Sequence, residues 1–152
     1  MDHVEKARSL FLNGANCAQA VAGAFADLCR MEEEKLIQLS CGFGGGVGRM
    51  REVCGAVSGM TLVADILYAS GSIGKGDKDA QYARIRELAE RFRQETGSIV
   101  CRELLGLEKA REESPVSAER TPEYYKKRPC VEMVALAASI LEEYIAQNPP
   151  AF

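Results

Sequence analysis

Apolar residues recur at intervals of three and four along most of this chain, and that periodicity limits the folds open to it. Such spacing puts the apolar side chains of a segment on one face of an α-helix. No segment shows the alternation of β-branched and polar residues that predicts a half-buried strand. The sequence therefore predicts an all-α fold, a compact single-domain helical bundle of about five to six helices over residues 1–152.

The segments with helical spacing are separated by residues of the types that commonly begin or end helices. Gly14 follows the first segment, Asn16 is placed as an N-cap for the second, and Pro129 opens the last. The helical segments cover residues 2–13, 17–29, 32–39, 54–69, 77–95, 101–105 and 129–147. Segment 54–69 is apolar on nearly every side except at Asp65, so we expect it to be buried.

Three other segments connect these helices. Residues 70–76 form a flexible connector, and residues 106–127 are charged and proline-containing, which predicts a surface excursion. Residues 42–48 are mostly glycine and could form a backbone nest for an anion, with Arg49 as a charged partner. A hinge, or a close approach of this loop to a site, is the favoured interpretation, because no Gly-Lys-Ser/Thr of a P-loop follows.

Charge and hydropathy argue against several classes of function. The formal net charge is −3, which gives no electrostatic reason to expect nucleic acid or an anionic membrane as a partner. Residues 1–6 carry charges where a signal peptide needs an apolar core, and no uncharged stretch reaches the ~20 residues of a spanning helix. We therefore expect a cytoplasmic protein.

Six cysteines in a reducing compartment point to metal binding or catalysis more than to a disulfide framework. Four of them lie in or beside the first turn of a predicted helix. These are Cys17, Cys54, Cys101 and Cys130. The first amides of a helix carry partial positive charge, which favours the thiolate, the form that attacks a disulfide or ligates a metal.

A single free cysteine is more commonly a small packing residue, but four with the same placement are harder to explain that way. Cys29 and Cys41 lack this placement, so we interpret them as packing residues or auxiliary thiols. No Cys-x-x-Cys occurs, which argues against a thioredoxin-type pair or a zinc knuckle. His3, the only histidine, lies near the terminus and is a poor candidate for a catalytic base.

Several motifs together resemble a known family. Residues 16–21 read Asn-Cys-Ala-Gln-Ala-Val, residues 42–46 Gly-Phe-Gly-Gly-Gly and residues 54–59 Cys-Gly-Ala-Val-Ser-Gly, and single cysteines follow at 101 and 130. In this order they resemble the C-GCAxxG-C-C family of redox-active proteins, over nearly the whole chain. The resemblance implies redox activity and identifies the same four cysteines as the family's own. Some similar proteins carry selenocysteine in place of a cysteine, which implies chemistry at the chalcogen.

Gly55 and Gly59 are four residues apart and so share one face of the predicted helix. Close packing against another helix is the favoured role of these glycines. A cofactor against that face is the alternative, and Gly55, Gly59 and Arg49 are then the candidate cofactor-binding residues.

Three functions remain open at this point. The first is a thiol oxidoreductase or electron carrier in which Cys54 attacks and Cys17, Cys101 or Cys130 resolves, with no cofactor required. The second is a metal protein in which the same four cysteines bind an iron–sulfur cluster or zinc. The third is a non-enzymatic helical module that binds a small ligand or a protein. The partner would be a redox protein or a small-molecule substrate, and a homodimer stays open.

Overall fold

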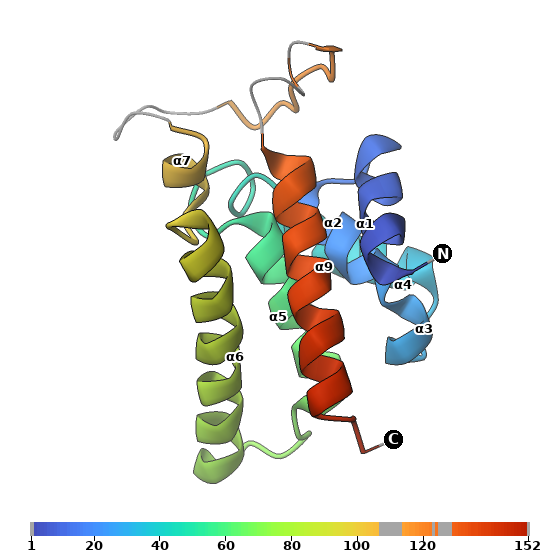
Figure 1. Ribbon diagram of the computed structural model, residues 1–152, viewed down its shortest axis with the longest axis vertical. Helices are drawn as coiled ribbons and strands as arrows, with labels where there is room; N and C mark the ends of the chain where they lie inside the picture. The colour runs from blue at the N-terminus through green and yellow to red at the C-terminus, as the bar shows by residue number, and fades with distance from the viewer. Residues whose placement is uncertain (1, 107–113, 123, 125–128, 152) are drawn as a thin grey trace.

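The computed structural model describes residues 2–106, 114–122, 124 and 129–151, and the regular elements in this part of the chain are helices (Figure 1). Their bounds are α1 (His3–Leu12), α2 (Cys17–Ala24), α3 (Ala26–Cys29), α4 (Glu33–Ser40), the 3-10 helix η1 (Cys41–Phe43), α5 (Gly55–Tyr68), α6 (Lys75–Thr96), α7 (Cys101–Leu104) and α9 (Cys130–Gln147). The all-α prediction is confirmed, and six of these α-helices have eight or more residues.

The predicted helix over residues 17–29 is two helices, because the chain leaves helical geometry at Phe25. Phe25 has φ −104° and ψ 18°, and its side chain is fully buried. Its ring stacks on that of His3, with the centroids 4.5 Å apart. The His3 ring nitrogens lie 3.0 Å from an Asp27 carboxylate oxygen and 2.9 Å from one of Glu142. His3 therefore links α1, α3 and α9.

Helix α5 lies at the centre of the bundle and packs against α2, α6 and α9 (Figure 1). Eight of its fourteen residues are buried, which confirms the prediction for this apolar segment. Helix α1 covers α2 and α9, and α6 runs antiparallel to α9 along the other side. In consequence α5 and α9 begin at the same end of the bundle, beside α7 and the loop that precedes α5.

Helix α5 approaches α2 closely because two of its residues have no side chain. A Cβ atom built on Gly59 would lie 2.7 Å from the Ala18 carbonyl oxygen and 3.0 Å from Cβ of Val21. A Cβ atom on Gly55 would lie 3.1 Å from the backbone nitrogen of Ala18 and from Cβ of Cys17. Helix packing, the favoured interpretation of these glycines, is confirmed.

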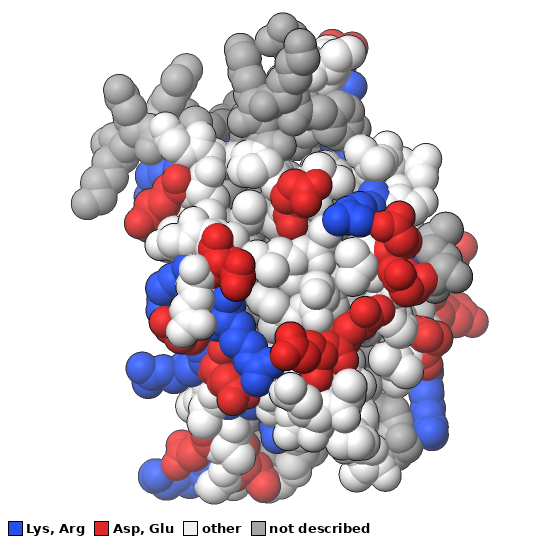
Figure 2. All heavy atoms as spheres, in the orientation of Figure 1, with Lys and Arg blue, Asp and Glu red and all other residues white. Residues whose placement is uncertain are grey.

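None of the helices within the described residues combines the length and apolar character needed to cross a membrane. On the face shown in Figure 2, acidic and basic side chains are interspersed, without a broad field of one sign.

We predict that Gly59→Ala destabilises the protein by roughly 1–2 kcal/mol, because overpacking at the α2–α5 contact costs more than the gain in helix propensity. Gly76→Ala in α6 is the matched control, since no atom lies within 4 Å of the Cβ it adds. Urea denaturation measures both variants. Equal stability of Gly59→Ala and Gly76→Ala would contradict the close packing.

Candidate functional site

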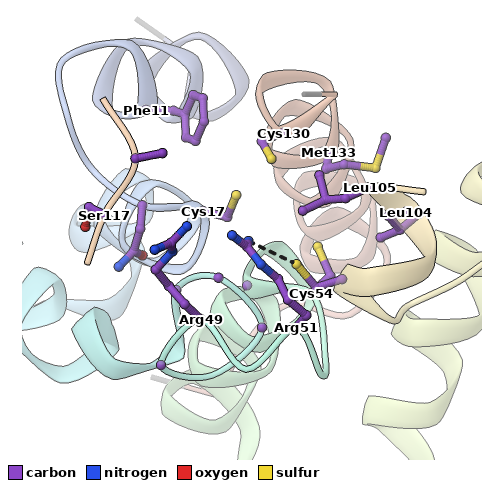
Figure 3. Close-up of a pocket in the computed structure, with 18 of the residues that line it drawn as sticks. Phe11, Cys17, Arg49, Arg51, Cys54, Leu104, Leu105, Ser117, Cys130 and Met133 are labelled. Atoms are coloured by element: carbon purple, nitrogen blue, oxygen red, sulfur yellow. Dashed lines mark hydrogen bonds between the residues drawn. The ribbon is translucent and has the colours of Figure 1, made fainter. Parts of the chain in front are cut away.

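The four cysteines at helix starts line one cavity of about 340 Å³ at the end of the bundle where α5 and α9 begin. Cys17, Cys101 and Cys130 are the first residues of α2, α7 and α9, and Cys54 is the N-cap of α5. All are free thiols. Figure 3 shows Cys17, Cys54 and Cys130 around one space. The sequence placed these cysteines at helix starts, and the fold brings the starts together.

Local hydrogen bonds fix three of these starts. Asn16 caps α2 as predicted: its side chain accepts from the Gln19 amide at 2.9 Å, and the Gln19 side chain accepts from the Asn16 amide at 3.0 Å. The Cys54 amide donates to the Ile99 carbonyl at 2.7 Å, and the Cys101 amide donates to the Glu52 carbonyl at 2.6 Å. Cys54 and Cys101 are therefore held side by side by their own backbones.

The glycine loop before α5 is a left-handed turn that lies against α7. Residues 45–49 all have φ between 54° and 70°, a region that favours glycine, and Val47 and Arg49 adopt it as well. A Cβ atom on Gly46 would lie 2.7 Å from Cβ of Cys101, so only glycine allows this approach. The prediction that the loop closely approaches the cysteine site is confirmed.

The same loop does not offer its amides to an anion in the way that a backbone nest would. The amides of Val47, Gly48, Arg49, Arg51 and Glu52 donate to carbonyl oxygens of residues 42–46. Those hydrogen bonds hold the left-handed turn instead, so the nest interpretation is not supported.

Three arginines line the cavity: Arg49, Arg51 and Arg120. Arg51 is 6% exposed, and its Nη1 lies 3.8 Å from Sγ of Cys101. Figure 3 shows Arg51 reaching toward the cysteines, with Arg49 to one side of them. The sequence indicated Arg49 as a charged partner of the glycine loop, but nothing in the sequence indicated Arg120.

The described part of residues 106–127 is more than a surface excursion, because Pro115, Ser117, Ala118, Arg120 and Tyr124 line the cavity. Two arginines hold this segment. Arg49 donates to the carbonyls of Ser114, at 2.7 Å, and Val116. Arg120 donates to the carbonyls of Ala15, at 2.7 Å, and Phe11, with its guanidinium 4.3 Å from the centroid of the Phe11 ring.

Burial and neighbouring thiols oppose the effect of the helix starts on ionisation. A hydrogen bond with the Cys130 thiol, together with burial, raises the pKa of Cys17 well above its usual value. Burial raises the pKa of Cys54 to about 12, although the amides of Ala56 and Val57 lower it. The prediction that helix starts favour ionisation is wrong for these two thiols. At Cys54 two N–H donors do not offset the loss of water, and at Cys17 the Cys130 thiol and burial raise the pKa.

A family model described as "Putative redox-active protein (C_GCAxxG_C_C)" matches residues 15–144. The chain belongs to this family. No curated protein and no solved structure matches the chain.

The family's four cysteines share a cavity, but their arrangement does not fit a metal centre. Within the described ranges, no three His, Cys, Asp or Glu side chains are grouped so that they could hold a metal ion. A structural zinc or an iron–sulfur cluster requires about four thiolates directed at one point. We therefore derive no step through a metal.

Of the other residues singled out in the sequence, some line the cavity and some do not. Gly55 and Arg49 line the cavity, whereas Gly59 lies against α2 and is not among the described residues of the wall. Cys29 is buried in the core, where burial raises its pKa to about 11, in agreement with a packing role. Cys41 is exposed and also lines the cavity, which its place in the sequence did not indicate.

We predict that alkylation by iodoacetamide at pH 7.5 modifies exposed Cys41 well before buried Cys54. Only the thiolate reacts, and a pKa of about 12 leaves about one Cys54 in 10⁵ ionised near pH 7. The rate at Cys54 should therefore rise about tenfold per pH unit from pH 7 to 10. Peptide mass spectrometry gives the rate at each cysteine, and a Cys54 rate that levels off below pH 9 would contradict the raised pKa.

Proposed function

We propose that this protein is a thiol oxidoreductase that cycles Cys17 and Cys130 between a dithiol and a disulfide in the cytoplasm. The observation that carries the proposal is that Cys17 and Cys130 begin two neighbouring helices at one cavity, which Cys54 and Cys101 also line (Figure 3), and that the Cys130 thiol is the first cause of the raised pKa of Cys17. A disulfide requires sulfurs ~2 Å apart with Cβ atoms ~4 Å apart, so the two side chains must approach each other within the cavity.

The raised pKa of Cys17 favours different roles for the two cysteines. Interaction with the Cys130 thiol and burial raise that pKa well above its usual value, and negative charge on Cys54 or Cys101 raises it further. We therefore assign the attacking thiolate to Cys130 and the resolving thiol to Cys17. This assignment replaces Cys54, whose pKa of about 12 makes it a poor nucleophile at neutral pH.

With a small disulfide as oxidant, the reaction balances in two exchanges. The Cys130 thiolate attacks one substrate sulfur, the substrate S–S bond breaks, and one thiol leaves with a proton. The Cys17 sulfur then attacks the mixed disulfide at Cys130, gives up its proton, and releases the second thiol. Two protein thiols are oxidised and one substrate disulfide is reduced to two thiols.

We propose that Cys54 and Cys101 act as a second pair, since backbone hydrogen bonds hold these two residues side by side. The guanidinium of Arg51, 3.8 Å from Sγ of Cys101, favours a thiolate at that sulfur. Attack by Cys101 on the Cys17–Cys130 disulfide, followed by resolution by Cys54, returns the first dithiol and leaves a Cys54–Cys101 disulfide. The cavity can thus pass two electrons between its two pairs.

The first test maps disulfides after the reduced protein is treated with one equivalent of a small disulfide. We expect the Cys17–Cys130 disulfide to form first, and Cys17→Ser or Cys130→Ser to lower the oxidation rate by at least about tenfold. Cys29→Ala is the matched control, since that thiol lies in the core away from the cavity and removing it should leave the rate unchanged. Cys17 and Cys130 that remain free while other cysteines pair would contradict the proposal.

The second test follows the midpoint potential of the protein against pH in thiol–disulfide redox buffers. Oxidation releases the proton of Cys17, whose pKa lies well above 9.0, so the potential should fall with rising pH. We expect at least about 30 mV per unit between pH 6 and 9, and about 59 mV where Cys130 is also protonated. A potential independent of pH would contradict the assignment.

The metal protein and the non-enzymatic module, the two other functions predicted from the sequence, would each give a different experimental result. Anaerobically purified protein that is brown, or that holds one zinc per chain, would favour the metal centre over thiol exchange. A variant without the four cysteines that still binds its partner equally well would favour the non-enzymatic module.

A further inference from the structure

The described residues of the cysteine cavity's wall carry a charge opposite to the net charge of the protein. The chain has a formal net charge of −3, yet the described residues of the wall include three arginines and no aspartate or glutamate. Elsewhere, on the face shown in Figure 2, acidic and basic side chains alternate. A concave surface with charges of one sign attracts ligands of the other sign.

The geometry of Arg120 shows how a positive charge is held at this wall. Its guanidinium donates to the carbonyl oxygens of Phe11 and Ala15, and it lies 4.3 Å from the centroid of the Phe11 ring and 5.8 Å from that of Tyr124. These contacts orient the side chain without a carboxylate among the described residues. Carbonyl oxygens and aromatic rings fix a guanidinium but leave its net charge in place.

Arg51 brings a second guanidinium to the cysteines of the cavity. It is 6% exposed and lies 3.8 Å from Sγ of Cys101, so little water screens its charge. The wall also includes apolar side chains, among them Phe11, Leu104 and Met133. A volume of about 340 Å³ lies at the lower end of the range for small-molecule sites.

We infer that this cavity binds a small organic anion and, resting on the function proposed above, that the redox substrate is a small disulfide with carboxylate groups. Arg120 holds a carboxylate end, since a guanidinium matches a carboxylate geometrically, and the apolar wall contacts the carbon chain between charge and sulfur. The reaction consists of the same two thiol–disulfide exchanges. One dicarboxylate disulfide is reduced to two carboxylate thiols, and the protein dithiol is oxidised to a disulfide.

The first experiment compares three disulfides of similar size as oxidants of the reduced protein. Dithiodipropionate is doubly negative, bis(2-hydroxyethyl) disulfide is neutral and cystamine is doubly positive. We expect dithiodipropionate to react at least about tenfold faster than the neutral compound, and cystamine to react slowest. The preference should shrink as salt rises from 50 to 500 mM. Equal rates for the three compounds would overturn the substrate assignment.

The second experiment needs no redox turnover, so it separates the anion site from the proposed function. Adipate, which has two carboxylates and no sulfur, should slow alkylation of the cavity cysteines, while uncharged adipamide should not. Buried Cys29 serves as an internal reference, since it lies in the core away from the cavity. Protection by inorganic phosphate but not by adipate would overturn the assignment of an organic anion.

Arg120→Gln should weaken adipate protection at least about tenfold. Arg84→Gln is the matched control, because Arg84 also lies over an aromatic ring, at 4.5 Å from the Tyr68 centroid, and donates to the Tyr144 hydroxyl away from the cavity. Arg120→Lys keeps the charge and guards against a folding defect, and it should retain most of the protection. Equal protection in Arg120→Gln and Arg84→Gln would overturn the role of Arg120.

The two readouts distinguish the two proposals. Adipate protection without reduction of any disulfide would support the anion site and contradict the oxidoreductase. Reduction of all three disulfides at one rate without adipate protection would support the oxidoreductase and contradict the anion site.

Discussion

The close packing of α5 against α2 is the contact on which the site depends. Gly55 and Gly59 allow it, because a Cβ atom at either position would meet the backbone of Ala18. The same contact brings the N-cap of α5, Cys54, beside the first residue of α2, Cys17. A second glycine contact, Gly46 against Cys101, sets the start of α7 beside them. The glycines of the sequence thus assemble the site and do not themselves carry its chemistry.

Inside the cavity, burial changes the pKa of a thiol more than the partial positive charge of a helix N-terminus does. A helix N-terminus favours a thiolate by at most a few kcal/mol, and removal of the thiolate from water opposes it. For Cys54 burial wins, and its pKa rises to about 12. A positive side chain beside a sulfur opposes this effect of burial, and Arg51 brings one to Cys101. Protonated thiols beside arginines suit a site that exchanges protons and electrons together.

Much of the fold was predictable from the sequence, since apolar spacing and caps are local signals. The Asn16 capping box, the buried segment 54–69 and the helix that ends at Gln147 all follow from such signals. The break at Phe25 was not predictable, because a tertiary contact, the stack on His3, accompanies it. The four cysteines could be selected by their common placement and by the family resemblance. Their contacts could not, since Cys17 and Cys130 lie far apart in the chain, and Arg120 reaches the cavity only through the fold.

The central claim is that thiols remote in sequence meet in one cavity and that Cys17 and Cys130 are the redox pair. Crystal structures of the protein reduced and then oxidised with one equivalent of a small disulfide measure this most directly. The account predicts Cys17 and Cys130 sulfurs in contact in the reduced crystal and ~2 Å apart after oxidation. Sulfurs on separate faces of the bundle, or a metal ion bound among them, would contradict it.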